Sequence, residues 1–213
     1  MTPHARFTAL VTADRAPRDN HRTLISSVLP RPIAFVSTVS ADGRPNLAPF
    51  SFFNAVGSNP PTVIFSPGTN RQGKPKDTLN NVRATGEFVV NVVTHGIREG
   101  MNETAYPYPP EVNEFEVGGF TPIPSRLVRP PRVAESPVHM ECQLVQIVPV
   151  GSGPASSNIC IGQVVCFHVA DGYLLPDGTV DVEKIDLLGR LGGDLYSTIR
   201  DRFAMPVPTE PKV

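Results

Sequence analysis

The sequence predicts a mainly β fold, a β-barrel accompanied by a few short helices. Segments rich in β-branched and aromatic residues recur between clusters of Gly, Pro and Asn, which is the pattern of strands joined by turns. Two of these segments, Val138–Val150 and Ile159–Ala170, are long and flank a Gly- and Ser-rich stretch, as in a hairpin that closes a barrel. A chain of 213 residues suits one barrel domain better than two domains.

The first half of the chain predicts a helix and then a β-meander. Asp19 can cap a short helix, which ends before the Arg31-Pro32 pair. An Asp-Gly pair and an Asn-Pro-Pro cluster then supply turns between three apolar segments. The three expected strands are Ile33–Val39, Asn46–Phe53 and Thr62–Ser66.

The second half predicts further helices around the long hairpin. A short helix should begin at Asp77 or Thr78 as its cap and stop at Gly86. Other expected elements are a strand at Glu87–Val93, a helix at Arg98–Ala105, a surface excursion at Tyr106–Pro131 and a helix containing Tyr196, Ile199 and Phe203.

Charge and composition narrow the classes of partner. The formal net charge is -1, with 18% charged residues, so no basic surface is expected for nucleic acid. The first residues carry no continuous apolar stretch for export or membrane anchoring, so we expect a cytoplasmic protein. We divide it into an extension (residues 1–18), a barrel domain (19–204) and a tail (205–213).

The cysteines and histidines favour structural roles. Cys142, Cys160 and Cys166 match neither a disulfide framework nor a zinc knuckle, so we expect buried thiols in a reducing compartment. His139 and His168 lie in predicted strands, with Glu141 on the same face as His139, which would allow a metal site or a proton relay. We expect hydrogen-bonded barrel histidines and no metal.

Two segments suggest a binding site. Hydroxyl, amide and cationic side chains gather before the helix at Asp77, where helix amides and cations favour a phosphate. They are Ser66, Thr69, Asn70, Arg71, Lys74, Lys76 and Thr78. The segment Leu47–Val56 mixes small, polar and aromatic residues that could border a flat heterocycle. A solvated basic loop and an ordinary core strand are the structural alternatives.

Five short motifs occur together in one order. They are Arg31-Pro-Ile-Ala-Phe-Val-Ser-Thr-Val, the Asp-Gly turn, Asn46–Asn54, Asn59-Pro-Pro and Lys76-Asp-Thr. In this combination the chain resembles the flavin reductase-like family over roughly residues 19–170, and more faintly through Leu188–Tyr196. Motifs for serine hydrolases, zinc peptidases, Walker loops and Rossmann dehydrogenases are absent from the sequence.

The resemblance implies an FMN-binding split barrel of Greek-key type that forms a homodimer. It implies that Ser66, Arg71, Lys76 and Thr78 hold the flavin phosphate, with Asp77 positioning the turn. It places Ser51, Phe53 and Asn54 at the ring or ribityl chain, with Thr38 and Tyr196 nearby. FMN, or alternatively FAD, would take hydride from NAD(P)H at flavin N5, so no side-chain acid or base is required.

The resemblance leaves several functions open. The protein could be a flavin reductase, including the reductase component of a flavin-dependent monooxygenase. It could instead be an FMN-binding storage or sensor module without nicotinamide turnover. Related split barrels also bind haem or pyridoxal phosphate, since a fold does not fix a function.

Overall fold

A seven-stranded antiparallel sheet forms the body of the computed structural model, which describes residues 5–70 and 72–210. The spatial order of the strands is β3-β2-β6-β9-β10-β5-β4. Their bounds are β2 (Ala34–Val39), β3 (Pro45–Phe50), β4 (Phe53–Ser58), β5 (Pro61–Phe65), β6 (Glu87–Val92), β9 (Val138–Val150) and β10 (Ser157–Val169). The prediction of a mainly β fold is confirmed.

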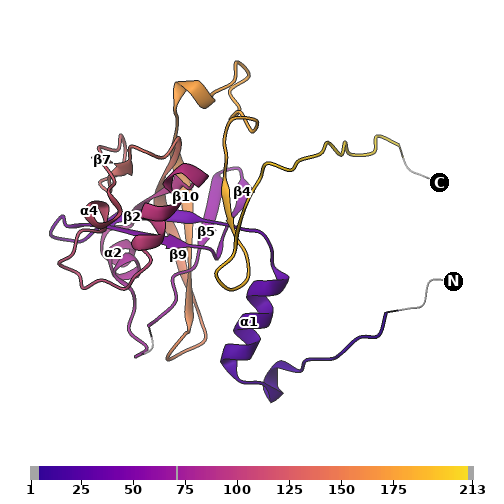
Figure 1. The fold of residues 1–213 in the computed structure, drawn as a ribbon. Coiled ribbons are helices and arrows are strands. Elements are labelled where there is room, and N and C mark those ends of the chain that lie inside the picture. Colours follow the sequence, from indigo (N-terminus) through magenta and orange to yellow (C-terminus); the bar gives the residue numbers. More distant parts are fainter. Residues whose placement is uncertain (1–4, 71, 211–213) are drawn as a thin grey trace.

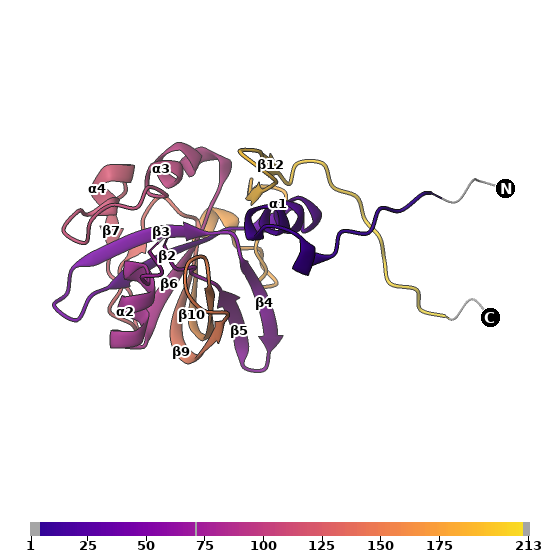
Figure 2. The ribbon, with the colours of Figure 1, turned by 90° about the horizontal axis from the view of Figure 1, so that it is seen from below.

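The sheet is strongly curled, as its connections require. Strands β3 and β4 lie at opposite edges of the sheet, yet only Ser51 and Phe52 separate them in the chain. The two edges must therefore approach each other at this point, and Ser66 N–H donates to the Phe52 carbonyl nearby at 2.9 Å. Figure 2 shows β3 and β4 diverging from this junction on either side of the β9–β10 hairpin. The result is an open barrel.

The expected three-strand meander is wrong in its third member. The turn at Asp42-Gly43 does pair β2 with β3. The return strand ends at Phe50, however, and Phe53 begins a separate strand, β4, which the sequence did not predict. Strand β5 pairs with β4 and β10 rather than with β3, because the long hairpin offers it a full-length partner.

Four α-helices and three 3-10 turns surround the sheet (Figure 1). The helices are α1 (Pro17–Ser27), α2 (Asp77–Thr85), α3 (Arg98–Glu103) and α4 (Glu114–Gly118), and the turns are η1 (Thr12–Asp14), η2 (His95–Ile97) and η3 (Asp171–Tyr173). Helix α2 stops at Gly86, which takes the expected left-handed conformation with φ 70°. Within the described residues, no helix is long and apolar enough to cross a membrane.

Two smaller sheets complete the structure. One joins β1 (Arg31–Pro32), β11 (Leu188–Arg190) and β12 (Tyr196–Thr198), and the other joins β7 (Pro122–Ile123) and β8 (Arg132–Val133). The helix expected around Tyr196 is therefore wrong. The Gly192-Gly193 turn folds Tyr196–Thr198 back as a strand against β11, and Phe203 is 80% exposed.

Two hydrophobic clusters form the core, one on each side of β2. The first lies inside the curled sheet, and Phe65 packs there against Phe88 with ring centroids 5.0 Å apart. The second joins Phe35 to Phe115 and Phe120. The segment at Tyr106–Pro131 is thus not only a surface excursion, because Phe115 and Phe120 are buried in this second cluster.

Two of the three cysteines are buried in the first cluster, as predicted. Cys142 and Cys160 are fully buried, and burial raises the pKa of Cys160 to about 12. Cys166 is partly exposed instead.

Packing around Phe88 makes Gly162 a sensitive position. A Cβ at Gly162 would overlap Phe88 Cζ and lie 2.7 Å from Phe88 Cε1. We expect Gly162→Ala to lower the free energy of unfolding by about 1–3 kcal/mol, because overpacking displaces a buried ring. Urea unfolding measures the change. Gly172→Ala is the matched control, since its added Cβ meets nothing within 4 Å, and equal stability of the two variants would contradict this packing.

Candidate functional site

A cavity of about 530 Å³ lies between β3, the start of α2 and the segment that follows α3. Asn46, Ala48 and Pro49 of β3 form one wall. The second wall is the approach to α2 and its first turns, with Asn70, Lys74, Pro75, Lys76, Asp77, Thr78 and Asn80. The third wall is the segment after α3, with Thr104, Ala105, Tyr106, Pro107, Tyr108, Pro110 and Glu114.

A buried polar network connects α2 to the sheet beneath this cavity. Asn46 Nδ2 donates to Thr38 Oγ1 at 3.2 Å and to Thr78 Oγ1 at 3.0 Å. Asn81 Nδ2 donates to the same Thr38 oxygen at 3.0 Å. All four side chains are buried. Because Thr78 accepts from Asn46, its own O–H remains available to donate.

Among the described residues, the Asp77 and Thr78 amides in the first turn of α2 have no hydrogen-bond acceptor, whereas Leu79 N–H donates to the Lys76 carbonyl at 3.0 Å. The N-cap residue is Lys76, in an extended conformation and without a side-chain cap bond, so the expected capping by Asp77 or Thr78 is wrong. The amides of the first turn therefore lack side-chain acceptors, and the positive end of the helix dipole favours an anion. The sequence did not reveal this, because Asp and Thr are common caps.

Lys76 adds a positive charge beside these amides. Its Nζ lies 5.5 Å from the centroid of the Phe50 ring. Desolvation by the surrounding protein lowers the pKa of Lys76. The residue is nevertheless exposed to solvent, so we expect an ammonium group at neutral pH. The amides, the hydroxyl of Thr78 and this ammonium make one end of the cavity suitable for a phosphate.

Two carboxyl groups line the cavity as well. Glu114 is 7% exposed, and its Oε2 accepts from Leu47 N–H at 3.2 Å. Desolvation raises the pKa of Glu114, and the charge of Asp77 adds to the rise. Desolvation also raises the pKa of Asp77, while Arg44 opposes the shift. The cavity lining therefore carries two lysines, Lys74 and Lys76, and two carboxyl groups, Asp77 and Glu114.

The loop before α2 is held by the turn of the β9–β10 hairpin. Ser66 and Ser157 share a hydroxyl hydrogen bond of 2.5 Å, and Thr69 N–H donates to the Ser156 carbonyl at 2.8 Å. Asn70 Oδ1 accepts from the backbone N–H of Lys74 at 2.8 Å, which stabilises the turn. This loop is thus anchored without help from a ligand.

The structure brings together some of the predicted site residues. Lys76, Asp77 and Thr78 line the cavity, and Thr38 lies directly beneath it through Asn46. Arg71 lies outside the described residues.

Five other predicted residues do not line this cavity. Ser51 and Phe53 lie at the β3–β4 junction, where Ser51 accepts from Arg31 Nε at 3.3 Å. Asn54 is exposed on β4. Ser66 is bonded to the hairpin turn, and Tyr196 is bonded to Arg190, which also stacks 4.4 Å from its ring centroid.

Several lining residues were not predicted from the sequence. Asn46 gave a signal, as an amide in an apolar strand, but its partners come from distant segments. Tyr106 and Tyr108, whose ring centroids are 4.9 Å apart, lie in a Pro-rich segment that carries no periodic pattern. Glu114 is one of several acidic residues there, and only the structure shows that it is buried.

Comparison with known proteins agrees with this architecture. An uncharacterized protein of Halalkalibacterium halodurans is 42% identical over 194 residues, covering 90% of this chain and 92% of that protein. The crystal structure of nitrilotriacetate monooxygenase component B from Bacillus cereus superposes with a TM-score of 0.90 at 34% identity, covering 94% of this chain and 100% of that chain. The 2-nitrobenzoate 2-nitroreductase of Pseudomonas fluorescens gives a TM-score of 0.86 at 30% identity, with coverages of 95% and 97%.

A family model matches most of the chain. The flavin reductase like domain aligns with residues 25–180, which include all seven strands of the main sheet and the start of α2. The cavity walls contributed by β3, α2 and the segment after α3 all fall inside this range. The chain therefore belongs to the flavin reductase like family, as its motifs predicted.

Proposed function

We propose that this protein is an NAD(P)H-dependent flavin reductase that binds FMN or FAD. Family membership supports flavin chemistry. The observation that carries the proposal is the anion-binding end of the cavity, where the uncapped first turn of α2 meets Lys76 and Thr78. A phosphorylated, largely flat cofactor needs this donor set at one end of a long cavity.

The residues present fit a flavin. A volume of about 530 Å³ lies in the range of small-molecule cavities. Lys76, Thr78 and the first α2 amides would hold the phosphate, and Asp77 would position the turn. A ring lying along β3 would reach Ser51, Phe53 and Asn54 at the β3–β4 junction. Contacts from Ser66, Arg71 and Tyr196 rest on the family resemblance alone, because Ser66 and Tyr196 do not line this cavity and Arg71 lies outside the described residues.

In this proposal the protein's own residues bind and orient the flavin. The Asn46 amide fixes the hydroxyl of Thr78, so that its O–H is available to a phosphate oxygen. Tyr106 and Tyr108 line the cavity and would contact a flat ring bound there. A bound flavin supplies the two-electron chemistry. No side chain is assigned as an acid or base.

The catalytic proposal is tested by steady-state oxidation of NADH and NADPH with added FMN or FAD. We expect protein-dependent loss of nicotinamide absorbance with at least one pair, because the cavity binds flavin beside an accessible face. Tight flavin binding without turnover would instead indicate a storage or sensor module. Purified protein with a Soret band and no flavin bands would contradict the proposal in favour of haem.

The phosphate assignment is tested by the double variant Lys76→Ala/Thr78→Ala. It removes one cationic and one hydroxyl contact, so we expect flavin affinity to fall by roughly 2 to 4 kcal/mol. Fluorescence titration with FMN measures the loss. The matched control is Lys184→Ala/Thr179→Ala, a lysine and a threonine remote from the cavity. Unchanged FMN affinity in a folded cavity variant would place the phosphate elsewhere.

We also propose that the protein forms a homodimer through β4 and α1. Every residue of β4 from Asn54 to Ser58 is exposed, and Val56 is 54% exposed on this edge strand. Helix α1 contributes no buried residue, and Leu24 within it and Val28 at its C-cap are 52% and 54% exposed. An isolated helix of this length is marginal without a packing partner. A second copy would cover both elements and close the β4 edge.

The proposal includes a role as the reductase component of a monooxygenase system. The similar protein from Bacillus cereus is named as component B of nitrilotriacetate monooxygenase. An open cavity would let reduced flavin leave for a separate oxygenase.

The dimer is tested by Val56→Asp, which places a charge on the proposed apolar interface. We expect the variant to sediment as a monomer where the unmodified protein sediments as a dimer, because an unpaired carboxylate would be desolvated there. Analytical ultracentrifugation distinguishes the two masses. Val182→Asp is the control, since Val182 is similarly exposed at 56% on another element. A dimeric Val56→Asp variant would rule out this interface.

A further inference from the structure

A second group of reactive side chains lies on the β9–β10 hairpin, away from the cavity. The strand register pairs His139 with His168 and Glu141 with Cys166 across the hairpin. Residues two apart on a strand share a face, so these four side chains form a compact patch. None of them lines the cavity described above.

A β-bulge creates this patch. Val164 pairs with Cys142, but Cys166 pairs with Glu141, so one extra residue is inserted at Val165. Val164 and Cys142 face the hydrophobic core. Simple alternation would point Cys166 and His168 into that core as well, and the bulge turns them to the face of Glu141. Bulges that re-aim side chains are over-represented next to functional sites.

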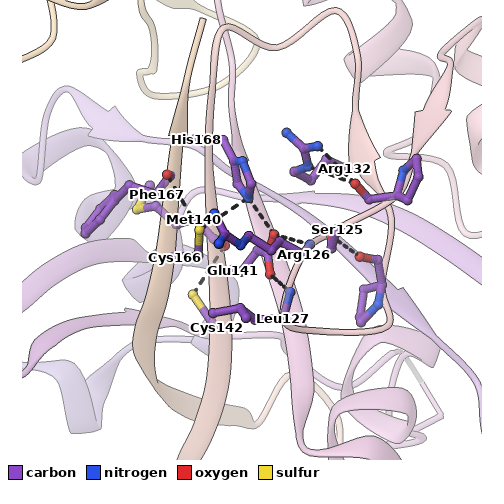
Figure 3. A network of polar contacts seen from close by, with 12 residues as sticks. Ser125, Arg126, Leu127, Arg132, Met140, Glu141, Cys142, Cys166, Phe167 and His168 are labelled. Atoms are coloured by element: carbon purple, nitrogen blue, oxygen red, sulfur yellow. Dashed lines mark hydrogen bonds and ion pairs between the residues drawn. The ribbon is translucent and has the colours of Figure 1, made fainter.

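A carboxylate oxygen of Glu141 and the sulfur of Cys166 both lie close to one ring nitrogen of His168. His168 Nε2 lies 2.5 Å from Glu141 Oε1 and 3.5 Å from Cys166 Sγ (Figure 3). A single imidazole nitrogen offers one hydrogen-bonding direction, so it cannot form a good hydrogen bond with both. The three ligand atoms all lie within 4.8 Å of one another. Such convergence is what a metal ion requires.

Glu141 is held rigidly for this role. Its side chain is fully buried, and the backbone N–H groups of Arg126 and Leu127 donate to its two oxygens at 2.7 and 2.6 Å. Each carboxyl oxygen accepts a backbone hydrogen bond, which fixes the orientation of the group toward His168. Oriented carboxylates of this kind are typical of metal sites.

His139, next to this cluster, has a buried ring nitrogen that lacks a hydrogen-bond partner among the described residues. It is 6% exposed, and its Nε2 donates to the Val133 carbonyl at 2.8 Å. Its Nδ1 is the one buried side-chain nitrogen or oxygen, among those of residues 5–70 and 72–210, that lacks a hydrogen-bond partner. The ring lies edge-on to His168 with centroids 6.2 Å apart. A buried acceptor without a partner beside this cluster needs an explanation.

We propose that Glu141, Cys166 and His168 form a binding site for a zinc-type divalent ion. Thiolate and imidazole ligands select zinc over magnesium or calcium. Thiolate and carboxylate together neutralise a divalent ion, while His168 binds as neutral imidazole. Three protein ligands leave the fourth tetrahedral position for water.

The ion would replace protons rather than rearrange the strands. Zinc at about 2.0–2.3 Å from each ligand separates sulfur and nitrogen by roughly 3.6 Å and nitrogen and oxygen by roughly 3.3 Å. The Cys166–His168 distance of 3.5 Å already fits. His168 must move away from Glu141 by under about 1 Å, and its 22% exposed side chain has room to do so. Cys166 releases its thiol proton to solvent, and the proton that His168 Nε2 donates to Glu141 must leave Nε2, with Nδ1 protonated from solvent, so that neutral imidazole binds the ion through Nε2.

The test is zinc uptake by the tag-free full-length protein, measured by equilibrium dialysis and elemental analysis. We expect about one zinc per chain with low micromolar affinity or better. Cobalt should give a thiolate charge-transfer band in the near ultraviolet. In Cys166→Ser and His168→Gln we expect affinity to fall at least about tenfold, with loss of that band in Cys166→Ser. His168→Gln retains an amide that can donate to Glu141 and so preserves the fold.

Matched controls separate this site from incidental binding. His21→Gln changes an exposed histidine on α1 and should bind zinc as the unmodified chain does. The absence of zinc binding by the unmodified chain, or undiminished binding by both site variants, would overturn the proposal. Since the readout is metal content and not turnover, the outcome does not depend on the proposed reductase activity.

Discussion

The buried hydrogen bonds among Thr38, Asn46, Thr78 and Asn81 fix the candidate site. They join β2 and β3 to the first two turns of α2, inside an otherwise apolar interface. Leaving any one of these buried groups unpaired would cost roughly 1–3 kcal/mol, so the helix has one favourable position against the sheet. That position aims its uncapped amides along β3 and brings Lys76 to the same end of the cavity.

Elements with local signals were predictable from the sequence. The β9–β10 hairpin was found because two long apolar segments flank a turn, and α2 because Gly86 marks its end. Strand β4 was missed because Ser51-Phe52 carries no turn signal, although it separates the two edges of the sheet. The helix expected at Tyr196 was wrong because pairing with β11 decides that segment, and pairing partners are not visible in local periodicity.

Only the part of the candidate site that has a local sequence signal was predictable. Lys76, Asp77 and Thr78 form one continuous motif, and all three line the cavity. Asn46 and Glu114 come from segments far apart in the chain, and their burial results from tertiary packing. The cluster of Glu141, Cys166 and His168 depends on a bulge at Val165. Because side chains alternate along a strand, the sequence placed His139 and Glu141 on one face. It could not show that the bulge in β10 turns Cys166 and His168 to that same face.

The β9–β10 hairpin contacts the loop before α2 and also carries the metal-type cluster, but the two proposed sites are separate. Its turn holds the loop before α2 through Ser157, whereas the metal-type cluster lies at Cys166, nine residues further along β10. At about 3.3 Å per residue these positions are roughly 30 Å apart along the strand. A divalent ion at the cluster would join residues of β9 and β10 directly, and would therefore act first on the rigidity of the hairpin.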